Sequence, residues 1–193
     1  MSQLRMPVTD RDHLLGSPDE AAIVLLEYGD YECPYCGMAQ ATVHGLIEAL
    51  GEQMCLAFRH FPLTQVHPHA LHAAEAAEAA AAQGAFWPMH ELLYQRQQQL
   101  DDTSLVEYAG ELGLDVDRFA DELASGVHEA RVREDFLSGA RSGVNGTPSF
   151  FINGERYLGS YDLESMLAAL RSVMPAPDAR AGKRRPPRTS PRR

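Results

Sequence analysis

Cysteine is scarce in this chain of 193 residues, which contains three. Three cysteines cannot form the disulfide framework that holds small secreted domains together, so that class of protein is excluded. No apolar run approaches the length of a membrane-spanning helix, and residues 1–10 lack the apolar segment and cleavage site of a secretory signal. We therefore expect a cytoplasmic protein without a membrane span, in a compartment where disulfides tend to be transient and catalytic.

Basic charge is sparse over most of the chain and is concentrated at its end. The sequence has 17 Lys and Arg residues against 27 Asp and Glu residues, a net charge of −10. Residues 175–193 carry seven basic residues, one acidic residue and five prolines but no large apolar residue. We predict a disordered basic tail there, and favour a solvated tail over an arm for anionic surfaces. The remaining body is acidic, which argues against nucleic acid as a partner.

The segment Cys33-Pro34-Tyr35-Cys36 is the main functional signal. It follows the apolar run 23–26 and precedes a helical apolar pattern that ends near residue 50. If Pro34 is the first helical residue, Cys33 is the N-cap and faces the free N–H groups and positive dipole end of the helix. Such a place favours the thiolate, which is the nucleophile in disulfide exchange. Cys36, one turn later, is placed to attack the first sulfur.

A C-x-x-C pair has other interpretations that must be weighed. It can be half of a zinc site, which needs two further ligands at suitable spacing. The third cysteine, Cys55, lies alone in an apolar stretch, and residues 60–72 contain four histidines that are better explained by helix capping or surface positions. We therefore predict no metal and favour redox chemistry. A non-catalytic metal-binding or redox-sensing module that uses the same cysteines is the alternative.

Apolar periodicity divides the chain into segments of different type. Residues 1–20 are predicted to be an N-terminal arm. A strand at 21–29, a helix at 34–50 and a strand at 54–61 form a β-α-β unit. Helical patterns fill residues 67–142, and a strand at 149–152, the turn Asn153-Gly154, a return strand at 156–158 and a helix that begins after Asp162 complete the chain. We expect an α/β domain formed by residues 21–66 and 143–174, interrupted by a helical insertion.

Four separated stretches occur in an order that is characteristic of one family. They are residues 27–36 (EYGDYECPYC), 59–63 (RHFPL), 84–90 (GAFWPMH) and 143–154 (GVNGTPSFFING). With them the chain resembles the DsbA-like branch of the thioredoxin superfamily over roughly residues 7–172. The resemblance implies a thioredoxin fold with a helical insertion and thiol–disulfide oxidoreductase activity. It also implies protein substrates with disulfides or thiols, a thiol redox partner for recycling, and no cofactor beyond the redox-active disulfide.

The resemblance also implies a role for individual residues. Cys33 would form the mixed disulfide with the substrate, and Cys36 would resolve it. Pro148 matches the cis-proline of the family, which faces the cysteine pair. It would expose the backbone of Thr147, so that an extended substrate segment can pair beside it. Thr147 would also touch the cysteines.

Three further positions are assigned through the same resemblance. Glu27 matches a buried acid beneath the active site, and we hypothesise that it exchanges protons with Cys36 through water. The alternative is a carboxylate at the strand end that reaches solvent. Pro34 and Tyr35 would belong to the substrate-binding surface. Because Tyr35 has no imidazole to stabilise a thiolate, we expect a less oxidising site than a Pro-His pair would give. The direction of electron flow stays open.

Overall fold

The computed structural model describes residues 3–175, so the predicted basic tail lies almost entirely outside the described residues. A five-stranded sheet has the strand order β1-β3-β2-β4-β5. The strands are β1 (His13–Leu15), β2 (Ile23–Gly29), β3 (Met54–His60), β4 (Ser149–Ile152) and β5 (Glu155–Arg156). β2 and β3 are parallel, and every other neighbouring pair is antiparallel. This mixed sheet confirms the predicted α/β fold class.

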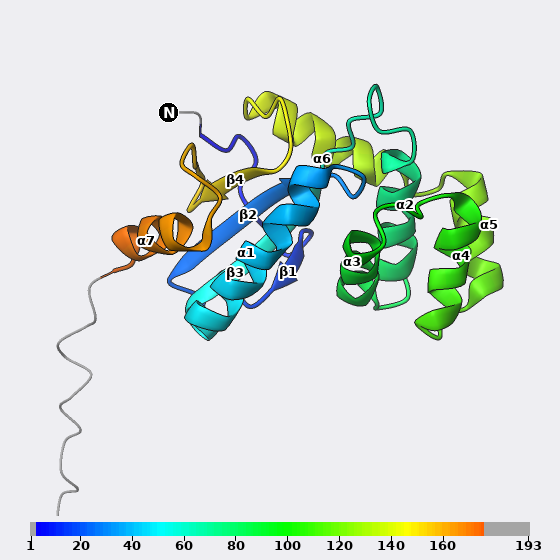
Figure 1. Ribbon diagram of the computed structural model, residues 1–193, viewed down its shortest axis with the longest axis horizontal. Helices are drawn as coiled ribbons and strands as arrows, with labels where there is room; N and C mark the ends of the chain where they lie inside the picture. The colour runs from blue at the N-terminus through cyan, green and yellow to red at the C-terminus, as the bar shows by residue number, and fades with distance from the viewer. Residues whose placement is uncertain (1–2, 176–193) are drawn as a thin grey trace, which may run out of the picture.

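Helices cover both faces of the sheet (Figure 1). α1 (Pro34–Leu50) and α7 (Leu163–Val173) pack on one face, where Ile23 and Leu25 point. α6 (Glu129–Arg141) contributes to the other face, where Leu26 and Tyr28 point. This alternation is the two-residue period of a strand. The side chain of Glu27 therefore faces α1, on the same side of the sheet as the cysteine pair.

The helical insertion stands beside the sheet. It comprises α2 (Ala70–Ala81), α3 (Phe86–Gln95), α4 (Asp102–Glu111), α5 (Val116–Ser125) and α6. In Figure 1 the helices α2 to α5 form a bundle beyond the N-terminal end of α1, and α6 leads back toward the sheet. The buried core of this bundle is continuous with Tyr31, Phe58 and the two active-site cysteines. The insertion therefore packs directly against the segment that carries the C-x-x-C pair.

The N-terminal arm is more integrated than its composition suggests. β1, within the predicted arm, pairs with β3 and forms one edge of the sheet. Arg59 holds the arm in place: its guanidinium donates to Asp12 at 2.6 and 3.0 Å and to the carbonyls of Met6 and Pro7 at 2.9 Å each. The sequence pattern missed this strand because three residues are too few to show a period. The return strand, predicted at 156–158, is β5 in the structure, at Glu155–Arg156, and so begins one residue earlier and ends two residues earlier.

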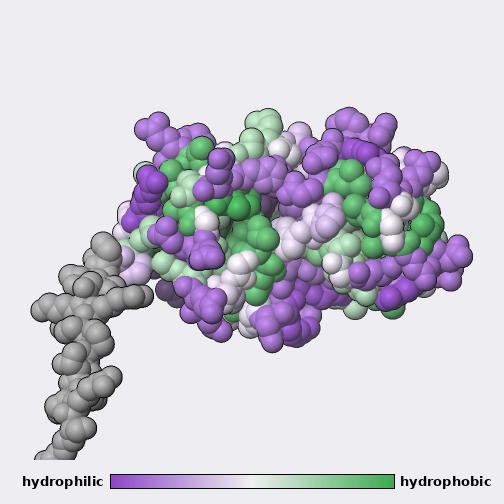
Figure 2. Space-filling model, turned by 90° about the horizontal axis from the view of Figure 1, so that it is seen from below, coloured by the Kyte–Doolittle hydropathy of each residue, from purple (hydrophilic) through white to green (hydrophobic). Residues whose placement is uncertain are grey.

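The face drawn in Figure 2 carries hydrophilic residues together with apolar areas on both halves of the molecule. Seen from below, these areas lie over the sheet half and over the helical insertion, with paler and hydrophilic residues between them (Figure 2). Within residues 3–175, no helix is long and apolar enough to span a bilayer.

Candidate active site

Cys33 is the N-cap of α1, with extended backbone angles (φ −73°, ψ 119°), and Pro34 opens the helix, as the sequence predicted. Both cysteines of the pair are free thiols. A hydrogen bond from Cys36 lowers the pKa of Cys33 to about 5. Burial opposes this shift, while Thr147 and the backbone N–H groups of residues 35 and 36 reinforce it. Cys33 therefore carries the thiolate at neutral pH, which is the reactive form.

The thiol of Cys36 behaves differently from that of Cys33, although both cysteines are buried. Cys36 is fully buried, and burial raises the pKa of its thiol well above the ordinary value. The hydrogen bond to Cys33 acts in the same direction, and so does a negative charge on Glu27 whenever that acid is ionised. Two thiols one helical turn apart thus have opposite tendencies: one is ionised and the other keeps its proton.

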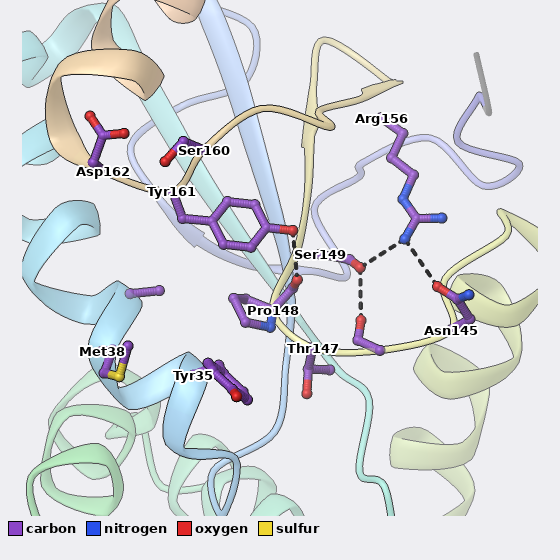
Figure 3. A pocket seen from close by; sticks show the side chains of 12 residues that line it. Tyr35, Met38, Asn145, Thr147, Pro148, Ser149, Arg156, Ser160, Tyr161 and Asp162 are labelled. Carbon is purple, nitrogen blue, oxygen red and sulfur yellow. Dashed lines mark hydrogen bonds between the residues drawn. The ribbon is translucent and has the colours of Figure 1, made fainter.

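The loop before β4 brings a distant segment to Cys33. The Thr147–Pro148 peptide bond is cis, and the Thr147 carbonyl oxygen lies 3.4 Å from the Cys33 sulfur, although 114 positions separate the two residues. Ser149 donates to the Gly146 carbonyl at 2.8 Å, and Arg156 reaches Ser149 and Asn145 at 3.3 Å each (Figure 3). These bonds hold the loop in the position that presents Thr147 to the cysteine.

A cavity of about 540 Å³ opens beside this loop and α1. Its lining includes Tyr35 and Met38 from α1, Thr147 and Pro148 from the loop, and Tyr161, whose hydroxyl donates to the Pro148 carbonyl at 3.2 Å (Figure 3). Tyr35 and Met38 are 67% and 69% exposed, so both offer apolar surface to a bound molecule. Of the four residues predicted to bind substrate, three line this cavity. Pro34 is also exposed but is not among the lining residues.

Glu27 is buried in β2, opposite Phe58 of β3 and Phe150 of β4. It does not reach solvent, so the alternative of a strand-end carboxylate does not hold. Burial raises its pKa from 4.5 to about 8, the neighbouring Gln40 amide partly offsets this, and the Cys33 charge adds to it. Within the described part of the chain, Glu27 Oε1 has no hydrogen-bond partner. The acid is therefore protonated at neutral pH and has room for another hydrogen bond.

One residue of this site escaped the sequence analysis. Gln97 follows α3 in the insertion, and its amide donates to the carbonyls of Tyr31 and Cys33 at 2.7 and 2.9 Å. Its side-chain oxygen lies against Gly37, where a Cβ would collide with it. Gln97 therefore fixes the backbone around the first cysteine from the insertion side. Nothing local marks it, because 64 positions separate it from Cys33.

The histidines that follow β3 do not gather around the cysteines. His67 Nδ1 lies 2.8 Å from the buried Asp30, and His72 Nδ1 lies 2.7 Å from Asp102 at the surface. Across residues 3–175, the side chains that are grouped closely enough to hold a metal include neither Cys33 nor Cys36. The geometry thus favours exchange chemistry at the pair over metal binding there.

Comparison with known sequences places this geometry in a family. Residues 24–171 match the model of the DSBA-like thioredoxin domain. Curated relatives are named Na(+)/H(+) antiporter NhaA. The protein from Salinispora arenicola is 48% identical over 171 residues, which are 88% of this chain and 26% of that protein. The protein from Herminiimonas arsenicoxydans is 42% identical over 161 residues, 83% of this chain and 25% of that protein. The chain thus spans about a quarter of these relatives, and the antiporter name describes the longer proteins.

Solved structures agree with the family match. A thioredoxin-like oxidoreductase from Silicibacter pomeroyi is 28% identical, with a TM-score of 0.74 over 85% of this chain and 92% of that one. Oxidised BdbD from Bacillus subtilis, at 18% identity, shares the fold with a TM-score of 0.76 over 84% of this chain and 92% of that one. The chain therefore belongs to the DSBA-like thioredoxin domain family.

Proposed function

We propose that the protein exchanges disulfides with protein substrates through Cys33 and Cys36. The observation that carries this proposal is the contrast within the pair: the Cys33 thiol has a pKa of about 5, and the pKa of buried Cys36 is raised. An ionised outer thiol and a protonated inner thiol suit an attacking and a resolving cysteine. Neither the attack nor the resolution needs a cofactor.

The exchange proceeds in two steps. The Cys33 thiolate attacks a substrate disulfide, a Cys33–substrate bond forms, and the second substrate sulfur leaves as a thiolate and takes up a proton. Cys36 then loses its proton and attacks the Cys33 sulfur, which releases the first substrate sulfur. The substrate gains two electrons, and the Cys33–Cys36 disulfide holds the oxidised state. The same steps in reverse oxidise a dithiol.

Glu27 is suited to the second step. Cys36 must lose a proton to attack, and its raised pKa makes this unfavourable without a base. The thiolate charge on Cys33 contributes to the raised pKa of Glu27, and that charge vanishes once the mixed disulfide has formed. Glu27 then ionises more readily and can accept the Cys36 proton, with a water molecule between them. In the reverse direction, protonated Glu27 returns the proton to Cys36.

The substrate is an extended peptide segment that contains a cysteine. The half-buried Thr147, whose carbonyl lies beside the Cys33 sulfur, offers backbone hydrogen bonds to such a segment. The neighbouring cavity, with Tyr35, Met38 and Tyr161 in its wall, accepts an apolar side chain next to the cysteine. A small thiol would leave this surface unused.

Trapping with single cysteine variants tests the proposal. Cys36→Ser is expected to accumulate mixed disulfides with protein substrates, whereas Cys33→Ser loses both exchange activity and adducts. Cys55→Ser, which removes the buried third thiol, serves as the control and is expected to retain activity. Full activity of Cys33→Ser, together with no adduct on Cys36→Ser, would reverse the assignment.

The cytoplasmic location and the thiol recycling partner stay predictions. Cell fractionation tests the first. Identification of the proteins trapped on Cys36→Ser tests the second, since a recycling partner also passes through a mixed disulfide with Cys33.

A further inference from the structure

Two imidazoles and one carboxylate meet where the insertion joins the sheet. His13 comes from β1, His60 from the end of β3 and Glu78 from α2. His13 Nε2 lies 2.7 Å from Glu78 Oε1, and His60 Nε2 lies 2.9 Å from the same oxygen. The three potential ligand atoms lie within 4.8 Å of one another. Three elements far apart in sequence thus point their ligand atoms at one place.

This donor set is one that divalent transition metals use. Imidazole nitrogen and carboxylate oxygen bind zinc at about 2.0–2.2 Å, and two histidines with one acid form a known three-ligand pattern. Tetrahedral bonds of that length place ligand atoms about 3.3 Å apart. The present separations are shorter by about half an ångström, so a small outward movement of the side chains makes room for an ion.

The surroundings permit that movement. His60 is fully buried, and its Nδ1 has no hydrogen-bond partner among residues 3–175, so a slight turn of the ring breaks no other bond. His13 stacks on Phe86 with ring centroids 3.4 Å apart, and its side chain is 14% exposed, which leaves a route from solvent. An apolar shell around a metal site limits the access of solvent and lowers the local dielectric.

The charges nearby are compatible with a cation. Without an ion, His13 Nε2 and His60 Nε2 each share a hydrogen with Glu78 Oε1, and these two hydrogens give way when an ion binds there. The Arg131 guanidinium lies 4.0 Å from the same oxygen. Arg131 is itself paired with Asp135, so its charge is largely compensated. The carboxylate is therefore available as an anionic ligand.

We propose that His13, His60 and Glu78 bind one divalent transition-metal ion, for which Zn²⁺ is the probe, with water completing the coordination. Both imidazoles bind through Nε2 and carry their protons on Nδ1. The ion joins β1 and β3 to α2 and so fastens the insertion to the sheet. It takes no part in the electron transfer at Cys33. The proposal departs from the sequence-based prediction of no metal, which weighed His60, His67, His69 and His72 but neither His13 nor Glu78.

Metal binding to the oxidised full-length protein tests the proposal, because a Cys33–Cys36 disulfide leaves no thiolate to compete for the ion. The protein is first stripped with a chelator, and Zn²⁺ is then titrated by calorimetry. We expect one ion per chain, and an affinity lower by about tenfold or more in Glu78→Gln and in His13→Gln. His72→Gln, which alters an exposed histidine paired with Asp102, is the matched control and is expected to bind like the wild type.

Two further readouts separate a lost ligand from a damaged fold. Zn²⁺ is expected to raise the thermal unfolding midpoint of the wild type and of His72→Gln but not of His13→Gln, whose site lies at the edge of the core. Co²⁺ substitution is expected to give a visible spectrum of nitrogen and oxygen ligands without thiolate charge-transfer bands. Failure of the oxidised wild type to bind Zn²⁺, equal affinity in all variants, or a thiolate spectrum would overturn the proposal.

Discussion

Replacing Glu27 by glutamine is expected to stabilise the protein in a pH-dependent manner. Glu27 is 1% exposed, and burial raises its pKa from 4.5 to about 8. At about 1.4 kcal/mol for each unit of pKa, ionisation of this carboxyl in the folded protein costs on the order of 5 kcal/mol. An enzyme that retains such a group without a catalytic use would carry a large and avoidable penalty.

The sign of the effect follows from proton linkage. Between pH 4.5 and about 8 the folded state keeps a proton on Glu27 that the unfolded chain releases. The stability contributed by this group is therefore fully present below pH 4.5 and is lost as the pH rises through about 8. Glutamine has no proton to lose. The stability of Glu27→Gln relative to wild type should rise steadily across this window, by several kcal/mol in total, and level off above it.

Urea unfolding of the oxidised proteins at a series of pH values from 4 to 9 measures this difference, since the disulfide removes the titration of Cys33 from the comparison. Without the thiolate charge on Cys33, the window is expected to end at a slightly lower pH. Glu48→Gln, which changes an exposed acid within α1, is the control and should show no such trend. A difference between Glu27→Gln and wild type that stays constant from pH 4 to 9 would refute the proposed burial and protonation of Glu27.

Three other expectations concern Cys33, Gln97 and the Arg59 pair. The alkylation rate of Cys33 should be constant above about pH 6 and fall tenfold per pH unit below its pKa of about 5; a midpoint at pH 8 or above would contradict the thiolate assignment. Gln97→Ala should lower the free energy of unfolding by about 1–3 kcal/mol, because two hydrogen bonds are lost. Gly37→Ala should destabilise the wild type but add little to Gln97→Ala, in which the side chain that the new Cβ would meet is gone. Additive losses in urea unfolding would argue against the contact. Asp12→Asn should lower the free energy of unfolding by about 3–5 kcal/mol, since it leaves the Arg59 guanidinium buried without its anion. A decrease below about 1 kcal/mol in urea unfolding would show that the pair is not desolvated.

Local chemistry determined the parts of this protein that the sequence predicted well. Pro34 cannot donate a backbone N–H, so it suits the first helical position and makes Cys33 the N-cap. Asp162 caps α7 by accepting from the Ser165 N–H at 2.9 Å. Asn153 and Gly154 adopt the positive φ angles of a tight hairpin turn. In each case the signal lies within a few residues, where backbone geometry and side-chain type are directly coupled.

Contacts between distant segments were decided only by the tertiary structure. The Thr147 carbonyl reaches Cys33, Gln97 reaches the backbone of the same residue, and β1 finds its partner in β3 across more than forty residues. Periodicity carries no information about which surfaces meet, because that depends on how the sheet and the insertion pack as a whole. The resemblance to a family supplied Thr147 in advance, but not Gln97.

The sequence by itself therefore determined the chemistry of the cysteine pair, the helix that activates it and the order of the elements. The tertiary structure decided the environment of each titrating group. Burial gives Glu27 a pKa near 8 and raises the pKa of the Cys36 thiol, and packing of the insertion on the sheet brings His13, His60 and Glu78 together. The physical reason is that desolvation and charge interactions depend on distances in the folded protein, which a local pattern of residues does not contain.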